Sequence, residues 1–169
     1  MRALVVYESM YGNTRMIAEA IGAGLGETCD VKVVRVGDVS PELLDGVDLL
    51  VVGGPTHVLS MSRQNTRRSA EQAAQKPDSK LHLEPDATGS GLREWLAALD
   101  RQTGRAAAFD TRMPGPAIMT GRASKAIARR LRRVGYQLAV APESFQVSRT
   151  NELLTGEADR ARAWGEQLT

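Results

Sequence analysis

Residues 3–14 read Ala3-Leu4-Val5-Val6-Tyr7-Glu8-Ser9-Met10-Tyr11-Gly12-Asn13-Thr14, a short apolar run that leads directly into a polar loop with one glycine. The apolar run, Ala3–Tyr7, is typical of a strand covered on both faces of a parallel sheet. From Thr14 to Leu25 the apolar residues recur at helical spacing. This order of strand, loop and helix predicts the first unit of an α/β fold.

Further strand-length apolar runs follow along the chain, and amphipathic segments separate them. The runs are Val31–Val36, Leu49–Val52, Ala106–Phe109 and Leu138–Ala141. The first of these alternates apolar with charged residues and the last ends at Pro142, so both fit sheet edges. The pattern predicts a doubly wound five-stranded parallel sheet in the order 2-1-3-4-5, with helices on both faces.

Helical spacing of apolar residues predicts the covering helices. They are Thr14–Leu25, Leu92–Leu99, Ala123–Val134 and Glu157–Leu168, together with a short helix at Val39–Asp45 that has Ser40 as its N-cap. We expect Pro142–Phe145 to turn the chain after the last strand, with Phe145 packing beneath it.

One stretch, Ser60–Ser90, does not follow the alternation because it is long and polar. Within it Thr66–Gln75 can form a helix, whereas Lys76–Gly91 has the composition of a loop or an insertion. The length of 169 residues suits one domain. We therefore expect a single domain over residues 1–169 with a polar insertion at about 60–90.

Composition excludes several classes of protein. The chain has 22 Lys and Arg against 20 Asp and Glu, a balance that does not suggest nucleic-acid binding. No apolar run approaches the roughly 20 residues of a membrane span, and the first residues do not form a signal peptide, so we expect a cytoplasmic protein. With a single cysteine and two histidines, neither an internal disulfide nor a metal site is expected. No catalytic residue is assigned.

The first loop has the composition of a phosphate site. Ser9 and Thr14 carry hydroxyl groups, Gly12 lets the backbone approach a ligand, and amides at the start of a helix face an anion. The candidate residues are Ser9, Met10, Tyr11, Gly12, Asn13 and Thr14. The alternative is an ordinary loop in which Asn13 or Thr14 caps the helix.

Other phosphate-binding motifs do not fit. A Walker A loop needs a Gly-Lys-Ser/Thr sequence, which the chain lacks. The glycines of Gly22–Gly26 end a helix and do not join a strand to one, so they are not a dinucleotide fingerprint. A response-regulator receiver needs an aspartate after the third strand, and here Gly53-Gly54-Pro55 follows it.

Three segments together resemble the flavodoxin family: Ser9–Thr14, Gly53–His57 and Phe109–Arg112. The resemblance spans nearly the whole chain and is weakest in Ser60–Ser90. It implies a flavodoxin-like fold, noncovalently bound FMN, and electron transfer at an exposed flavin edge. It also implies that Ser9–Thr14 hold the phosphate and that two later loops flank the isoalloxazine ring. These loops contribute Pro55, Thr56, His57, Val58 and Leu59, and Phe109, Asp110, Thr111 and Arg112.

The chain departs from the family in the aromatic residues that usually stack on the ring. The loop after the third strand offers only the imidazole of His57, and the loop after the fourth offers only Phe109. Phe109 either covers the ring or belongs to the strand and packs in the core. One missing aromatic stack removes roughly 0.5–1.5 kcal/mol, which is about tenfold in affinity.

Three functions are compatible with these residues. The first is an FMN-binding electron carrier. The second is an FMN-dependent reductase or oxidase, similar to quinone reductases or protoporphyrinogen oxidases. The third is a flavodoxin-like interaction domain with weak FMN binding or none.

A basic segment bears on the partner. Gly121–Gly135 contains six Lys and Arg and no acid. We expect Arg63, Arg112, Arg122 and Lys125 to form a basic rim around the flavin opening. This rim would attract a redox partner protein or an NAD(P)H reductant through its charge.

Overall fold

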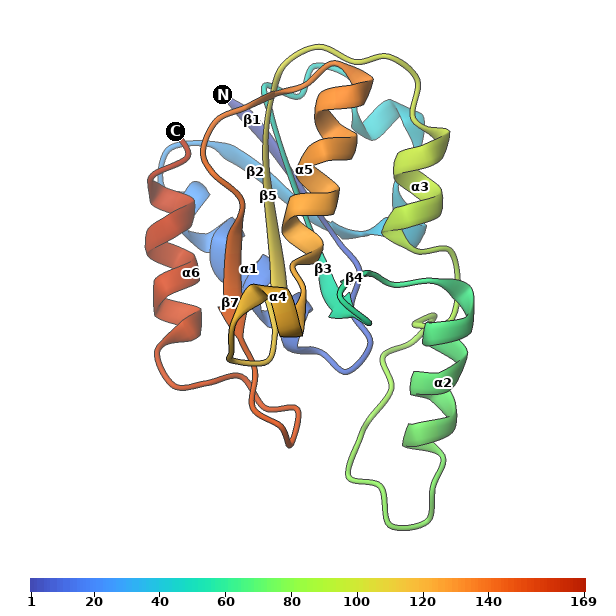
Figure 1. Ribbon diagram of the computed structural model, residues 1–169. Coiled ribbons are helices and arrows are strands. Elements are labelled where there is room, and N and C mark those ends of the chain that lie inside the picture. The colour runs from blue at the N-terminus through green and yellow to red at the C-terminus, as the bar shows by residue number, and fades with distance from the viewer.

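The structure, a computed structural model, describes residues 1–169 and shows a central sheet between two layers of helices (Figure 1). The main path of the sheet is β2-β1-β3-β5-β6, with β4 paired to β3 and β7 paired to β5. The predicted order 2-1-3-4-5 is confirmed, since β5 is the fourth strand and β6 with β7 the fifth. The strands are β1 (Arg2–Tyr7), β2 (Asp30–Arg35), β3 (Leu49–His57), β4 (Ser60–Met61), β5 (Arg105–Arg112), β6 (Gln137–Leu138) and β7 (Glu143–Gln146).

Four helices lie where helical spacing placed them, to within a few residues: α1 (Asn13–Leu25), α3 (Leu92–Ala98), α5 (Ala123–Val134) and α6 (Glu157–Glu166). A helix also forms at α2 (Gln64–Ala74), close to the possible helix Thr66–Gln75, whereas α4 (Ala117–Thr120) was not predicted. The segment Val39–Asp45 forms only a single 3-10 turn at Pro41–Leu43, and Ser40 makes no capping hydrogen bond through its side chain. None of the helices combines the length and the apolar character that a bilayer crossing needs.

The alternation of side chains along β1 divides the core into two halves. Val5 points to the face covered by α1 and α6, whereas Leu4 and Val6 point to the face covered by α3 and α5. Because both faces of β1 are covered, an uninterrupted apolar strand is required there. Because β1, β3 and β5 pair in parallel, their carboxyl ends lie at one edge of the sheet.

The fifth strand differs from the prediction. β6 pairs with the start of β5 and β7 with its end, and residues 139–142 separate them. β6 ends at Leu138, so most of the predicted strand Leu138–Ala141 lies in the gap; Pro142, which has no amide hydrogen to donate to the ladder, is the last residue of the gap, and pairing resumes at Glu143. The predicted turn at Pro142–Phe145 is therefore wrong, although Phe145 is fully buried as expected.

The polar insertion leaves the sandwich after β4. Its helix α2 stands to one side of the sheet, and no helix or strand forms between Ala74 and Leu92 (Figure 1). Only Arg67 of α2 is buried. The insertion is therefore attached mainly through polar contacts, which lie next to the first loop.

Candidate functional site

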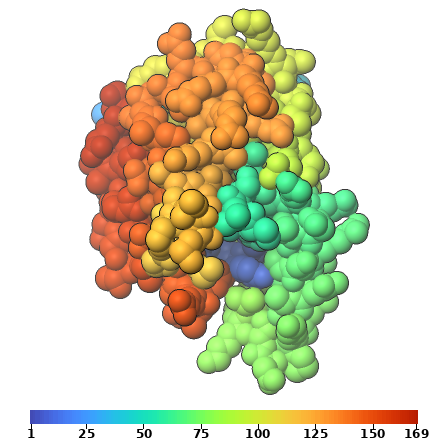
Figure 2. All heavy atoms as spheres, in the orientation of Figure 1, coloured from blue at the N-terminus to red at the C-terminus, as the bar shows by residue number.

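The loops at the carboxyl ends of β1, β3 and β5 surround a pocket of about 200 Å³. Figure 2 shows the first loop, in dark blue, at the floor of a hollow between the β3–β4 hairpin, in teal, and the segment around α4, in yellow-orange. The predicted residues that line the pocket are Ser9, Met10, Tyr11, Asn13, Thr14, Pro55, Thr56, His57, Thr111 and Arg112. The sequence reasoning missed Met113, Thr120, Val147, Ser148, Arg149 and Asn151, which also line it.

The first loop leaves a group of backbone amides free. Gly12 has a φ of 95°, and its own amide donates to Ser9 Oγ at 3.1 Å. The amides of Tyr11, Asn13, Thr14 and Arg15 have no acceptor, because they precede the first hydrogen-bonded turn of α1. Free amides at a helix N-terminus form an anion-binding site, and the glycine conformation keeps side-chain atoms away from it.

Side chains of the same loop connect it to the rest of the pocket. The hydroxyl oxygens of Thr14 and Thr111 lie 2.7 Å apart, and both residues are buried. The amide group of Asn13 donates to the backbone oxygen of Asn151 at 3.0 Å and to its side-chain oxygen at 3.1 Å. These contacts fix the loop between β5 and the segment that follows β7.

The insertion supports the outer side of the loop. The Tyr11 hydroxyl donates to the carbonyl of Ala70 at 2.8 Å, and the amide of Glu84 donates to the carbonyl of Met10 at 2.7 Å. The Glu84 carboxylate pairs with Arg15 at 3.1 Å. Burial raises the pKa of Tyr11, so its hydroxyl remains protonated and can donate this hydrogen bond.

The β3–β4 hairpin has a two-residue turn at Val58 and Leu59, whose φ angles are 45° and 70°. Such angles match a type I′ turn, which glycine or asparagine normally forms, so a β-branched valine there is strained. Leu59 bridges to Gly121, where an added Cβ would lie 2.1 Å from the Leu59 Cα. The hairpin therefore packs directly against the start of α5. Neither Val58 nor Leu59 lines the pocket, and both are exposed on its rim.

Two predicted residues cap a helix. Asp110 Oδ2 accepts from the amide of Ser124 at 2.8 Å and from the hydroxyl of Thr56 at 3.2 Å, and Thr56 Oγ1 accepts from the amide of Ala123 at 2.9 Å. Asp110 is fully buried and does not line the pocket. Asp110 therefore satisfies the amide of Ser124 and Thr56 satisfies that of Ala123, both at the start of α5, and the buried Asp110 side chain does not reach the pocket.

The sequence left open whether Phe109 covers the flavin ring or packs in the core, and the structure places it in the core. Its ring is fully buried and makes edge-to-face contacts with Phe145 and Trp164, at centroid distances of 6.2 and 6.5 Å. A Cβ at Gly53 would lie 2.1 Å from Phe109 Cζ, so the neighbouring strand needs glycine for this ring to fit. The aromatic side chains that line the pocket are therefore those of Tyr11 and His57.

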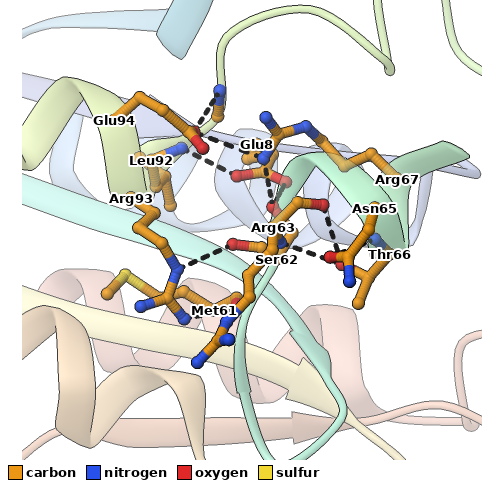
Figure 3. A network of polar contacts seen from close by, with 11 residues as sticks. Glu8, Met61, Ser62, Arg63, Asn65, Thr66, Arg67, Leu92, Arg93 and Glu94 are labelled. Carbon is orange, nitrogen blue, oxygen red and sulfur yellow. Dashed lines mark hydrogen bonds and ion pairs between the residues drawn. The ribbon is translucent and has the colours of Figure 1, made fainter.

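A buried polar network joins the end of β1 to the insertion (Figure 3). The Glu8 carboxylate accepts from the Ser62 hydroxyl and, at 2.8 Å, from the amide of Leu92. Arg67 donates to Ser62 Oγ at 2.9 Å and pairs with Glu94 at 3.3 Å. Burial raises the pKa of Glu94, but the hydrogen bond from Arg67 and its charge outweigh burial, so the pKa is lowered overall.

Glu8 was not predicted to have this role, although a carboxylate directly after a buried apolar strand is an unusual signal. Its contacts hold the hairpin and the start of α3 against the first loop. His57 lies close enough to Glu8 and Arg67 for both charges to influence the pKa of its imidazole. Burial, the largest influence, lowers the pKa of His57; Glu8 raises it and Arg67 lowers it by less. The imidazole is therefore neutral at neutral pH and offers one donor and one acceptor.

Of the four cations predicted to form a basic rim, two are engaged in hydrogen bonds within the protein. Arg112 donates to the carbonyl of Gly115 at 3.1 Å and to the hydroxyl of Thr120. Arg122 donates to the carbonyl of Pro142 at 2.7 Å and to Ser144 Oγ at 3.1 Å. These two arginines hold loops together, whereas Arg63 and Lys125 are exposed and make no ion pair.

The sequence profile of the flavodoxin family matches residues 5–100, a span that includes the first loop and the β3–β4 hairpin. The chain belongs to the flavodoxin family. Members of this family bind FMN and transfer electrons to redox partners, so the chain is an FMN-binding, flavodoxin-like electron-transfer protein. A search of curated protein sequences found no match.

Solved flavodoxin structures share the whole fold. A flavodoxin from the domain Archaea has 22% identity and a TM-score of 0.67, covering 99% of this chain and 96% of its own. Flavodoxin 1 from Bacillus cereus has 16% identity and a TM-score of 0.66, with 99% and 97% covered. A flavodoxin from Streptococcus pneumoniae TIGR4 has 18% identity and a TM-score of 0.65, with 99% and 97% covered. At these identities the likeness shows the fold.

The residues of this flavodoxin pocket fit FMN chemically. Four free amides and the hydroxyl groups of Ser9 and Thr14 suit a phosphate group. The other end, lined by Pro55, His57 and Met113, offers flat or polarisable surface for an aromatic ring but no stacked aromatic pair.

Proposed function

We propose that the flavodoxin binds FMN in this pocket and exchanges electrons with an acidic protein partner at the pocket rim. The proposal is based mainly on four backbone amides at the start of α1 that have no hydrogen-bond acceptor. They surround Gly12, whose backbone has the left-handed conformation. A dianionic phosphate is the ligand group that such a site suits best. FMN then supplies the redox chemistry, and the protein supplies binding, orientation and electrostatics.

Each part of the pocket has a distinct role in this proposal. Ser9, Thr14 and the free amides hold the phosphate, and Asn13 keeps their loop closed against Asn151. The backbone and side chains of Pro55, Thr56 and His57 bound one side of the ring. Thr111, Arg112 and Met113 bound the other side. Val58 and Leu59 extend the rim and do not reach into the pocket.

The partner surface combines apolar and basic residues. Met113–Met119 contains no polar side chain and is exposed throughout, and Ile118 is 88% exposed. Val58, 81% exposed, lies on the neighbouring hairpin. Exposed apolar runs of this length mark interaction sites, and a small reductant would not need so much apolar surface.

Cations flank this apolar surface. Lys125 and Arg129 line a hollow beside Ile118, together with residues that include no acid. A protein with an acidic rim and an apolar centre complements this arrangement, and the charges would steer its approach. An acidic protein is therefore favoured over NAD(P)H as the partner.

Comparing two ligands tests the phosphate site. The apoprotein should bind FMN at least about a hundredfold more tightly than riboflavin, because charge-assisted hydrogen bonds to several amides are lost without the phosphate. Quenching of flavin fluorescence during titration measures both dissociation constants. Equal affinities would show that the first loop does not hold the phosphate, and an absence of binding by either flavin would refute the whole proposal.

A further inference from the structure

A second cavity lies beside the first loop, and the proposed function does not use it. Its volume of about 220 Å³ is close to the 200 Å³ of the pocket proposed for FMN, and Ser9 is the only residue that lines both. It lies at the carboxyl ends of β1 and β2, where Tyr7 pairs with Arg35. Open parallel sheets bind their ligands at the carboxyl ends of the strands. The cavity is therefore at the edge where ligands bind, but outside the FMN pocket.

The polar insertion closes this cavity. Residues between Pro85 and Ser90 form one of its walls. Arg35 Nη1 donates to the carbonyl of Pro85 at 2.8 Å, and the amide of Leu92, just after this wall, donates to Glu8 Oε2 at 2.8 Å (Figure 3). The wall is therefore attached to the ends of both strands. A long loop without helix or strand inside a compact domain usually has a function, and enclosing this cavity gives the insertion one.

The charged residues of this cavity differ from those of the FMN pocket. Glu8, Asp38 and Asp86 line the cavity, whereas no carboxylate lines the FMN pocket. The one cation among its lining residues is Arg35, which also lies 3.6 Å from the Glu84 carboxylate. Carboxylates repel a phosphate group, and the guanidinium beside them disfavours a cationic ligand. A neutral ligand with both hydrogen-bond donors and acceptors fits these groups best.

Two further features of the lining indicate the shape of that ligand. Val36, directly after β2, and Ala87, in the insertion, are both 7% exposed, so two walls offer small apolar side chains to a flat ring. Asp38 follows the end of β2 by three residues. In open parallel sheets that bind nucleotides, an acid placed after the second strand accepts hydrogen bonds from ribose hydroxyls. A ribose with an attached base combines both requirements.

We infer that this second cavity binds a nucleoside that carries no phosphate group. The ribose hydroxyls donate to the Asp38 carboxylate, and the base lies against Val36 and Ala87 with Arg35 as a donor for its acceptor atoms. The site does not require FMN, because the two cavities have only Ser9 in common. It goes beyond the proposed function, which leaves this cavity and the wall formed by the insertion without a role.

Isothermal titration calorimetry with two ligands tests this inference. Adenosine should bind at least about tenfold more tightly than dideoxyadenosine, which lacks both ribose hydroxyls and so loses the hydrogen bonds to a charged acceptor. In Asp38→Asn the affinity for adenosine should fall about tenfold, and the difference between the two ligands should largely disappear. Asp38 is exposed, so the substitution should not disturb folding. Asp78→Asn removes the same charge from an exposed position outside the cavity and should change neither affinity.

Repeating the adenosine titration with FMN at saturation separates the two cavities. An unchanged affinity is expected, and competition would place adenosine in the FMN pocket and overturn the inference. No binding of adenosine, equal affinities for the two ligands, or equal losses in Asp38→Asn and Asp78→Asn would also overturn it. Failure of FMN to bind would refute the proposed function alone, because adenosine has no phosphate and does not depend on the first loop.

Discussion

The side-chain amide of Asn13 donates to both the backbone oxygen and the side-chain oxygen of Asn151, at 3.0 and 3.1 Å. These residues are 138 positions apart in the chain, and Asn151 has a left-handed φ of 62°. The contact closes the pocket on the side opposite the β3–β4 hairpin. It therefore links the geometry of the phosphate loop to a segment at the other end of the sequence.

Removing this contact should weaken FMN binding. In Asn13→Ala both hydrogen bonds are lost and the segment at Asn151 is released, so we expect about tenfold weaker FMN binding. Asn151→Gly is the matched control, because it tolerates the positive φ and keeps the bond to the backbone oxygen. Fluorescence titration should place its affinity between those of the wild type and Asn13→Ala. Equal affinities in all three proteins would contradict the proposed closure.

A side chain at Gly12 should abolish binding and leave the fold intact. A Cβ there would lie 3.3 Å from Glu84 Oε1, and the φ of 95° disfavours any residue with a Cβ, valine most of all. We expect Gly12→Val to lower the affinity for FMN by at least about a hundredfold, with a far-ultraviolet circular dichroism spectrum like that of the wild type. Gly37→Ala, where no atom lies within 4 Å of the added Cβ, is the control for adding a methyl group.

An aromatic residue at Met113 should improve the ring site. Met113 lines the pocket and is 49% exposed, so a larger side chain has room to cover the flavin. We expect Met113→Tyr to tighten FMN binding by up to about tenfold. Ile118→Tyr adds the same group outside the pocket and should leave the affinity unchanged. A weaker complex in Met113→Tyr would mean that another residue already covers that side of the ring.

His57 should make the stability of the apoprotein depend on pH. Burial lowers its pKa in the folded state below the ordinary value of 6.5, so the unfolded chain binds more protons between the two values. The free energy of unfolding therefore has its full value above about pH 6.5 and decreases as the pH falls from 6.5 to the lower pKa of His57 in the folded state. Urea unfolding should show a smaller loss of stability between pH 7.5 and pH 5.5 in His57→Gln than in the wild type. His82→Gln, at an exposed position, should behave like the wild type.

The two ends of α5 should differ in their effect on partner reaction. Lys125 and Arg129 line the hollow beside α4, whereas Arg132 and Arg133 lie in the last turn of the helix. Reversing Lys125 and Arg129 to Glu should slow reduction or oxidation by an acidic redox protein about tenfold at low salt, since electrostatic steering is lost. Stopped-flow measurements over a range of salt concentrations would detect this. The same reversal at Arg132 and Arg133 should have little effect; equal rates for both pairs would remove the basis for an acidic partner.

The first loop could be predicted because its signals are local. Strand, glycine and helix start lie within twelve residues of each other, and the free amides follow from the helix geometry alone. The segment Val147–Asn151 could not, because it reaches the pocket only through the pairing of β7 with the end of β5. Pro142 was interpreted as the end of the last strand, but β6 ends earlier, at Leu138, and the chain resumes pairing with β5 directly after Pro142.

Asp110 shows a different limit. A carboxylate at the end of a buried strand suggests a ligand site, yet its partner is the amide of Ser124, fourteen residues further along. Whether such a residue faces a ligand or a helix start depends on where the next helix packs. For Phe109, too, the sequence did not decide between the pocket and the core. Gly53 of the adjacent strand makes room for the Phe109 ring in the core, but the two residues can be recognised as neighbours only when the register of β3 and β5 is known.

The interruption between β6 and β7 has a consequence for how the molecule behaves at high concentration. A long, regular edge strand is a template on which another chain can add its own strand, the first step of β-type aggregation. At this edge the ladder is broken at residues 139–142, and at the opposite edge β2 carries Asp30, Lys32 and Arg35. Neither border of the sheet therefore offers an unbroken, uncharged row of amide and carbonyl groups. The protein exposes the apolar segment Met113–Met119, but the edges of its sheet are protected against the addition of strands from other molecules.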